Sequence, residues 1–154
     1  MIFLDRLVET TGLRVVTVPH QGGLDASDTS EDLAMHAELA DRMSHAVTQD
    51  PVHDVRTIAS LTRGAALSIS TRYHPVVFAS SAGVPTIGLA VDRYTHRKIA
   101  GALDNIGLAE LALPASALAT QTASTVLDEV WRQRDRVSEH MLQALPAARA
   151  HQSD

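Results

Sequence analysis

The chain has 154 residues, of which 45% are hydrophobic and 20% charged, and its formal net charge is −5 at pH 7. This composition is typical of a globular protein, and no Lys- or Arg-rich run provides the basic surface that nucleic acid binding requires. The chain contains no Cys, which excludes disulfides and thiolate metal sites. Because it shows neither a signal-peptide pattern nor an apolar run of the ~18 residues that suggest a membrane span, we expect a cytoplasmic protein.

The first third of the chain predicts alternating helices and strands. Apolar residues at helical spacing indicate a helix over residues 2–11, and the β-branched run of residues 14–18 indicates a strand. This strand leads into a loop containing His20, which would lie at the ligand-binding edge of a sheet if the strand is parallel to its neighbours. The next expected elements are a helix over residues 31–44, a short strand over 46–48 and a helix over 49–62.

The central stretch predicts two strands joined by a short helix. The first strand is the apolar run over residues 65–69, and the second is the run over residues 84–90. Between them, Pro75 and Gly83 bracket an apolar helix, since Pro favours the first helical position and Gly the position after the last. A further helix is expected over residues 95–106.

A polar cluster follows each of these two strands. The first cluster consists of Arg72, Tyr73 and His74. The second cluster consists of Asp92, Arg93, Tyr94, His96, Arg97 and Lys98. Strands joined through a helix run parallel, so we expect the clusters to meet at one edge of the sheet, where open parallel sheets bind ligands. The cations of this edge and the N-terminus of the first helix favour a small molecule carrying carboxylate or phosphate.

The remainder of the chain predicts one more strand and further helix. Alternating residues 109–113 indicate a strand that Pro114 ends, and residues 116–145 indicate one long helix or a pair. We expect residues 146–154 to be a disordered tail. About five short, mostly parallel strands with interleaved helices predict a single Rossmann-like, doubly wound α/β domain over residues 1–145.

The central stretch resembles the polysaccharide pyruvyl transferase family. Members of that family carry an Arg-x-His motif, an apolar helix, a Gly-Val-Pro strand, a Lys and a Gly-Leu ending in their C-terminal half. The corresponding residues here are Arg72-Tyr73-His74, 76–79, Gly83-Val84-Pro85, Lys98 and Gly107-Leu108. The resemblance implies that the chain is the C-terminal, GT-B-like half of such an enzyme, and that a missing N-terminal half holds most contacts to the acceptor.

The resemblance also implies a reaction and roles for the polar residues. The family transfers a pyruvyl group from phosphoenolpyruvate to saccharide hydroxyls to form a ketal, and this chain would supply the donor-binding half. Arg72 and His74 would be the catalytic residues, with Arg72 holding the anionic groups and His74 protonating the methylene carbon. The substrate-binding residues would be Arg72, Tyr73, His74, Lys98, Arg97, Tyr94 and His20. We expect no cofactor and no metal, because the remaining His residues lack the spacing of a metal site.

Two other functions fit the same fold prediction. A GT-B glycosyltransferase half would bind a nucleotide sugar, using Asp92 for the ribose hydroxyls and Tyr94 as a shelf for the base. A non-catalytic half-domain would instead pair with a partner, either the missing N-terminal half or a second copy in a homo-oligomer. An exposed apolar surface would then mark the docking face.

Overall fold

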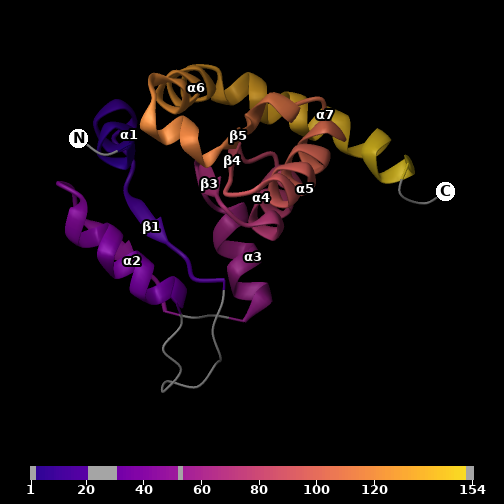
Figure 1. Cartoon of the computed structure of the whole chain (residues 1–154). Helices are drawn as coiled ribbons and strands as arrows, with labels where there is room; N and C mark the ends of the chain where they lie inside the picture. Colours follow the sequence, from indigo (N-terminus) through magenta and orange to yellow (C-terminus); the bar gives the residue numbers. More distant parts are fainter. Residues whose placement is uncertain (1–2, 21–30, 52–53, 152–154) are drawn as a thin grey trace. The chain divides into compact units, whose positions relative to one another are not determined.

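The computed structural model describes residues 3–20, 31–51 and 54–151 (Figure 1). The chain divides into two compact units, an N-terminal unit of residues 1–58 and a C-terminal unit of residues 59–154. Each unit contains its own parallel sheet with helices between the strands, which confirms the predicted α/β class. Among the described residues, no helix is both long enough and apolar enough to span a membrane.

The N-terminal unit contains two helices and two parallel strands. These elements are α1 (Phe3–Thr11), β1 (Val15–Thr17), α2 (Glu31–Arg42) and β2 (Val47–Gln49). All four lie close to their predicted positions, and β1 pairs with β2 so that Val15 is opposite Val47. The buried carboxylate of Asp5 on α1 accepts hydrogen bonds from the backbone N–H groups of Ser44 (2.8 Å) and His45 (3.3 Å). These bonds tie α1 to the segment just before β2.

Helix α3 (Val55–Arg63) begins later than the predicted start at residue 49. Oδ1 of Asp54 accepts hydrogen bonds from the backbone N–H groups of Arg56 (2.8 Å) and Thr57 (3.0 Å). A carboxylate in this position satisfies N–H groups that the first turn of a helix leaves without an internal partner. The helix therefore starts after this cap, and Pro51, which the prediction placed inside the helix, lies before it.

A three-stranded parallel sheet organises the C-terminal unit. Its strands are β3 (Ser68–Ser70), β4 (Thr86–Ala90) and β5 (Ala112–Pro114), in the order β3-β4-β5. Helix α4 (Tyr73–Ser80) connects β3 to β4, and helix α5 (Arg93–Asp104) connects β4 to β5. Two successive βαβ units thus share β4, which is buried at all five positions. The largest fully buried side chains of this unit include Val76, Ile87, Ile99, Leu103, Leu127 and Met141.

Glycines end α4 and α5 as the sequence predicts. Gly83 has φ +72°, and the N–H of the next residue, Val84, donates to the carbonyl of Ala79 (3.0 Å). Gly107 has φ +71°, and the N–H of Leu108 donates in the same way to the carbonyl of Leu103 (2.9 Å). This six-to-one bond is that of the Schellman motif, which needs a residue in the left-handed region where Gly carries no steric cost.

The C-terminal segment differs from its prediction in two places. Residues Ala109–Leu111 form a 3-10 turn, η1, and only Ala112–Pro114 are strand, whereas a strand over residues 109–113 was expected. The N–H of Leu111 donates to the carbonyl of Leu108 (3.1 Å), so this local turn replaces the first part of the ladder. After the second 3-10 turn, η2 (Ala115–Ala119), come α6 (Gln121–Arg132) and α7 (Arg134–His151).

The pair α6 and α7 confirms one of the two options for residues 116–145. Helix α7 continues through Pro146 to His151, into the segment where the sequence predicts a disordered tail. Residues 147–150 include three Ala, the residue with the highest helix propensity, which favours this continuation.

The five predicted strands are present and parallel, but they form two sheets instead of one. β1 pairs with β2, and β4 pairs with β3 and β5. Four of the five strands have only three residues, so each forms few ladder hydrogen bonds. Their local residue pattern identifies them as strands, but the partner of each strand depends on residues distant in the sequence.

Candidate functional site

The carboxyl ends of the three parallel strands of the C-terminal unit lie along one edge of its sheet. Ser70 of β3 is opposite Gly88 of β4, and Ala90 of β4 is opposite Pro114 of β5. Helices α4 and α5 both begin at this edge and pack against each other (Figure 1). The fold therefore brings the two predicted polar clusters to the same edge, at the starts of neighbouring helices.

Arg72 is the N-cap residue of α4. Its backbone is extended (φ −108°, ψ 145°), and its N–H donates to Oγ of Ser70 (3.0 Å), which in turn donates to the carbonyl of Arg72 (3.2 Å). These bonds fix the direction in which the chain leaves β3. Pro75 lies in the first turn of α4 but not at its first position, because the helix already begins at Tyr73. Pro is tolerated there because the N–H groups of the first turn have no partner inside the helix.

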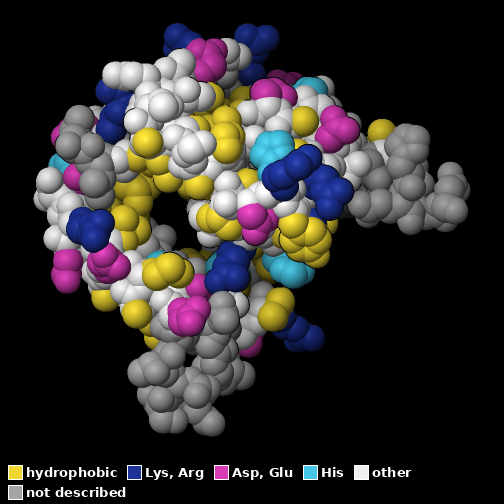
Figure 2. All heavy atoms as spheres, viewed as in Figure 1, with side chains coloured by type: hydrophobic (Ala, Val, Ile, Leu, Met, Phe, Trp, Pro, Cys, Tyr) yellow, Lys and Arg dark blue, Asp and Glu magenta, His cyan; other side chains and the backbone are white. Residues whose placement is uncertain are grey.

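The side chains of the first cluster are exposed at the start of α4. The imidazole of His74 packs edge-on against the ring of Tyr73, with 5.5 Å between the ring centroids. On its other side it approaches the ring of Phe78, at 6.3 Å. The imidazole is exposed to solvent beside these two rings. Figure 2 shows His side chains and Lys or Arg side chains close together over the region of α4 and α5.

The second cluster lies on the first two turns of α5. Asp92 is the N-cap residue, and its Oδ1 accepts a hydrogen bond from the N–H of Thr95 (2.7 Å), which lowers the pKa of the Asp92 carboxyl. Nζ of Lys98 lies 4.5 Å from the centroid of the Tyr94 ring, so these two predicted site residues share one helical face through a cation–π contact. Arg97, Tyr94 and Lys98 are all exposed.

An open hollow of about 320 Å³ lies at the carboxyl ends of β4 and β5. It is lined by Ala90, Val91, Asp92, Arg93, His96, Pro114, Ala115 and Ser116. Arg93 and His96 belong to the second predicted cluster but were not predicted as site residues, and Ser116 was not predicted at all. The rule that found the other clusters would have found Ser116 too, because this residue follows the end of β5 as Asp92 follows the end of β4.

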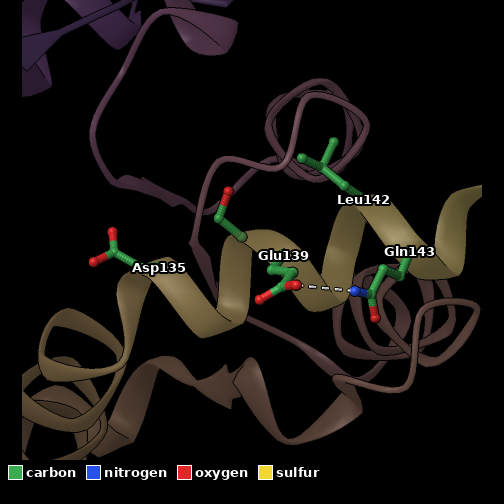
Figure 3. Close-up of a pocket in the computed structure, with 5 residues that line it drawn as sticks. Asp135, Glu139, Leu142 and Gln143 are labelled. Atoms are coloured by element: carbon green, nitrogen blue, oxygen red, sulfur yellow. Dashed lines mark hydrogen bonds between the residues drawn. The ribbon is translucent and has the colours of Figure 1, made fainter.

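A second hollow, of about 420 Å³, lies along α7 and does not suit an anion. Figure 3 shows the residues that line it, all from α7: Asp135, Ser138, Glu139, Leu142 and Gln143. Two of the five are carboxylates, and Oε1 of Glu139 accepts a hydrogen bond from Nε2 of Gln143 (3.1 Å). Across the described part of the chain, no group of three or more His, Asp or Glu side chains is arranged to hold a metal ion.

His20 belongs to the N-terminal unit, whereas the other predicted site residues belong to the C-terminal unit. Its backbone N–H donates to Oδ2 of Asp32 (2.9 Å), a buried carboxylate on α2. The fold confirms that His20 follows β1 and that β1 is a parallel strand. A place for His20 beside Arg72 and His74 stays a prediction.

The comparison with protein families supports the resemblance seen in the sequence. The family model described as polysaccharide pyruvyl transferase matches residues 1–93 of the 154-residue chain. The match includes His20, Arg72, Tyr73 and His74, and it ends at the start of α5 before Tyr94, Arg97 and Lys98. Comparisons with curated proteins and with solved structures gave no significant match.

Proposed function

The chain belongs to the polysaccharide pyruvyl transferase family, and we propose that it binds the donor phosphoenolpyruvate at the start of α4. Phosphoenolpyruvate carries a carboxylate and a phosphate, and its methylene carbon must gain a proton before hydroxyl groups can add to the neighbouring carbon. The site therefore needs fixed cations and a proton donor. Arg72 and His74 are two residues apart at the start of α4, and both are exposed there.

We assign the anionic groups of the donor to Arg72 and to the N-terminus of α4. The planar guanidinium of an arginine can donate two parallel hydrogen bonds to a carboxylate or phosphate. The backbone N–H groups of the first helical turn add the positive end of the helix dipole. Further along the same edge, Arg97 and Lys98 on α5 would stabilise the charge of the leaving phosphate.

His74 is the proposed proton donor to the methylene carbon. Imidazole is the side chain that most readily gives and takes protons near neutral pH. The His74 ring lies edge-on to the ring of Tyr73 and near the ring of Phe78, and it is exposed, so the donor could reach it. The observation that carries the proposal is this arrangement: a cation, an exposed imidazole and a helix N-terminus at one sheet edge, within the part of the chain that matches the family.

Calorimetric titration of the chain with phosphoenolpyruvate tests the proposal. A charge-assisted hydrogen bond contributes about 1.5–3 kcal/mol, so Arg72→Ala should weaken binding by about ten- to hundredfold. Arg136→Ala, which removes an exposed arginine from α7, is the matched control and should bind like the unchanged chain. The proposal is wrong if the chain fails to bind phosphoenolpyruvate, or if Arg72→Ala and the control bind it equally well.

The nucleotide-sugar alternative has weaker support. The family model that matches the chain is described as a pyruvyl transferase, and Tyr94, the residue assigned to the base, lies beyond the matched residues 1–93. A thermal-shift comparison separates the alternatives, because phosphoenolpyruvate and not UDP should raise the melting temperature. A transfer assay, with and without a second half-domain supplied, would distinguish an enzyme from a non-catalytic binding module.

A further inference from the structure

We infer that the hollow at the carboxyl ends of β4 and β5 binds the saccharide acceptor, and that His96 takes the proton from the hydroxyl group that attacks the donor. This inference rests on the proposed function for the reaction, but its binding part concerns a different surface. The hollow lies one strand further along the edge than Arg72, since β5 adjoins β4 on the side opposite β3. None of the residues assigned to the donor lines it.

The chemistry of the lining favours a neutral polyhydroxyl ligand. Arg93 provides hydrogen-bond donors, Asp92 provides an acceptor, and His96 and Ser116 can each do both. The Asp92 carboxylate is a fixed negative charge, because its hydrogen bond to the N–H of Thr95 lowers its pKa. A phosphate group in the hollow would meet this negative charge, whereas a sugar can pair hydroxyl groups with donors and acceptors alike.

The apolar part of the hollow also suits a sugar. Four of the eight lining residues are apolar, namely Ala90, Val91, Pro114 and Ala115. Val91 is 67% exposed, so its apolar side chain is available to a ligand in the hollow. Small-molecule sites combine such apolar walls with a few placed polar groups, and the volume of about 320 Å³ lies within their usual range.

His96 is the group in the hollow best suited to accept a hydroxyl proton. It lies one turn into α5, and its backbone N–H donates to the carbonyl of Asp92 (2.9 Å), so the rigid start of the helix positions it. Its side chain is half-buried in the wall of the hollow. Adjacent strands lie about 4.8 Å apart, so the hollow at the ends of β4 and β5 begins about one strand spacing from the end of β3.

The attacking hydroxyl group must lose a proton during the transfer, and we assign this proton to His96 because it lines the hollow. His74 gives a proton to the methylene carbon, the first saccharide hydroxyl then bonds to the adjacent carbon, and its proton passes to His96. The carbon–oxygen bond to phosphate breaks, and the second hydroxyl bonds to the same carbon and loses its proton to the departing phosphate. Exchange with water then reprotonates His74 and deprotonates His96. The products are the ketal and hydrogen phosphate.

Titration of the isotope-labelled chain with the methyl glycosides of glucose, galactose and mannose, followed by NMR, tests the inference. At least one glycoside should shift the backbone amides of Val91, Arg93 and Ser116 and the ring nitrogens of His96. His96→Gln and Ser116→Ala should each weaken that binding by about three- to tenfold, the effect of losing one hydrogen bond. His45→Gln, a change of the same kind in the N-terminal unit, should leave it unchanged.

A parallel titration with phosphoenolpyruvate separates the inference from the proposed function. Donor shifts at the start of α4, without glycoside shifts in the hollow, would overturn the inference and leave the proposed function standing. Glycoside shifts in the hollow without donor binding would support the acceptor site and refute the donor site. Glycoside binding that both hollow variants leave unaltered would also overturn the inference. If His96→Gln fails to fold, Ser116→Ala at the far wall decides the result.

Discussion

Gly88, in the middle of β4, sets the distance between the sheet and α5. A Cβ added at this position would lie 2.2 Å from Cγ2 of Ile99, which is on the facing side of α5 and has no exposed surface. Carbon atoms in contact are about 3.5–4.0 Å apart, so the two groups would have to separate by more than an ångström. Ile is β-branched and stiff at χ1 in a helix, so the side chain has little freedom to rotate away.

Gly88→Ala is therefore expected to destabilise the C-terminal unit. Overpacking a core by a methyl group usually costs about 1–3 kcal/mol, and the short contact with Ile99 places this case at the upper end. The cost is reduced by about 0.5–1 kcal/mol, because Ala loses less backbone entropy than Gly on folding. The net loss in the free energy of unfolding should be about 2 kcal/mol.

A double-mutant cycle with Ile99→Ala tests the cause of this loss. Ile99→Ala alone should cost about 2–5 kcal/mol, but it also removes the Cγ2 atom that the new methyl group would meet. In that background, Gly88→Ala should become neutral or slightly stabilising. Urea unfolding of the four proteins, followed by circular dichroism, measures the cycle. An equal cost of Gly88→Ala in both backgrounds would refute the reasoning.

Three further predictions concern helix ends. The Asp92 carboxyl has a lowered pKa, so its contribution to stability is present above the unfolded pKa of about 3.9 and is lost as the pH falls below it. In urea unfolding at acidic pH, the free energy of unfolding should therefore fall less with decreasing pH for Asp92→Asn than for the unchanged chain. Gly83→Ala should lower the free energy of unfolding by about 1–2 kcal/mol or more, since φ is +72° and the new methyl group would approach Leu142. Gly101→Ala, in open space on α5, should instead raise the free energy of unfolding by up to ~1 kcal/mol. Changes of the same sign in the melting temperatures of the two variants would contradict this. Asp54→Ala should cost about 0.5–2 kcal/mol by uncapping α3, and an unchanged urea midpoint would show that the cap is dispensable.

Local sequence patterns were sufficient to predict the type and order of most elements. The apolar period of 3.6 or 2 residues and the helix and turn signals of Gly and Pro are properties of neighbouring residues, so α1, α2, α5, β1, β2 and β4 lie near their expected positions. Strands β3 and β5 each begin three residues later than expected. Gly83 and Gly107 were identified as helix ends for a physical reason that holds in the structure, namely their positive φ. Tyr94 and Lys98 are four residues apart on α5 and therefore share a helical face, as their contact shows.

The candidate site was predictable only in part. Parallel strands bring the residues after each strand to one edge, and this rule placed Arg72, His74 and the start of α5 there from the sequence. The same rule places His96, at the start of α5, and Ser116, just after β5, at this edge, but it does not show that these two segments line one hollow. Whether two such segments enclose a space depends on packing and has no signature in either segment.

The sequence by itself determined the α/β class, the succession of helices and strands, and the polar clusters that follow the strands, since each depends on residues within a few positions of one another. Only the tertiary structure decided which strands pair, and it divided them into sheets of two and three. It also decided that residues 109–111 turn instead of extending, and that His96 and Ser116 line one hollow. Strand partners and cavities are made by contacts between segments far apart in the chain, and local propensity does not encode those contacts.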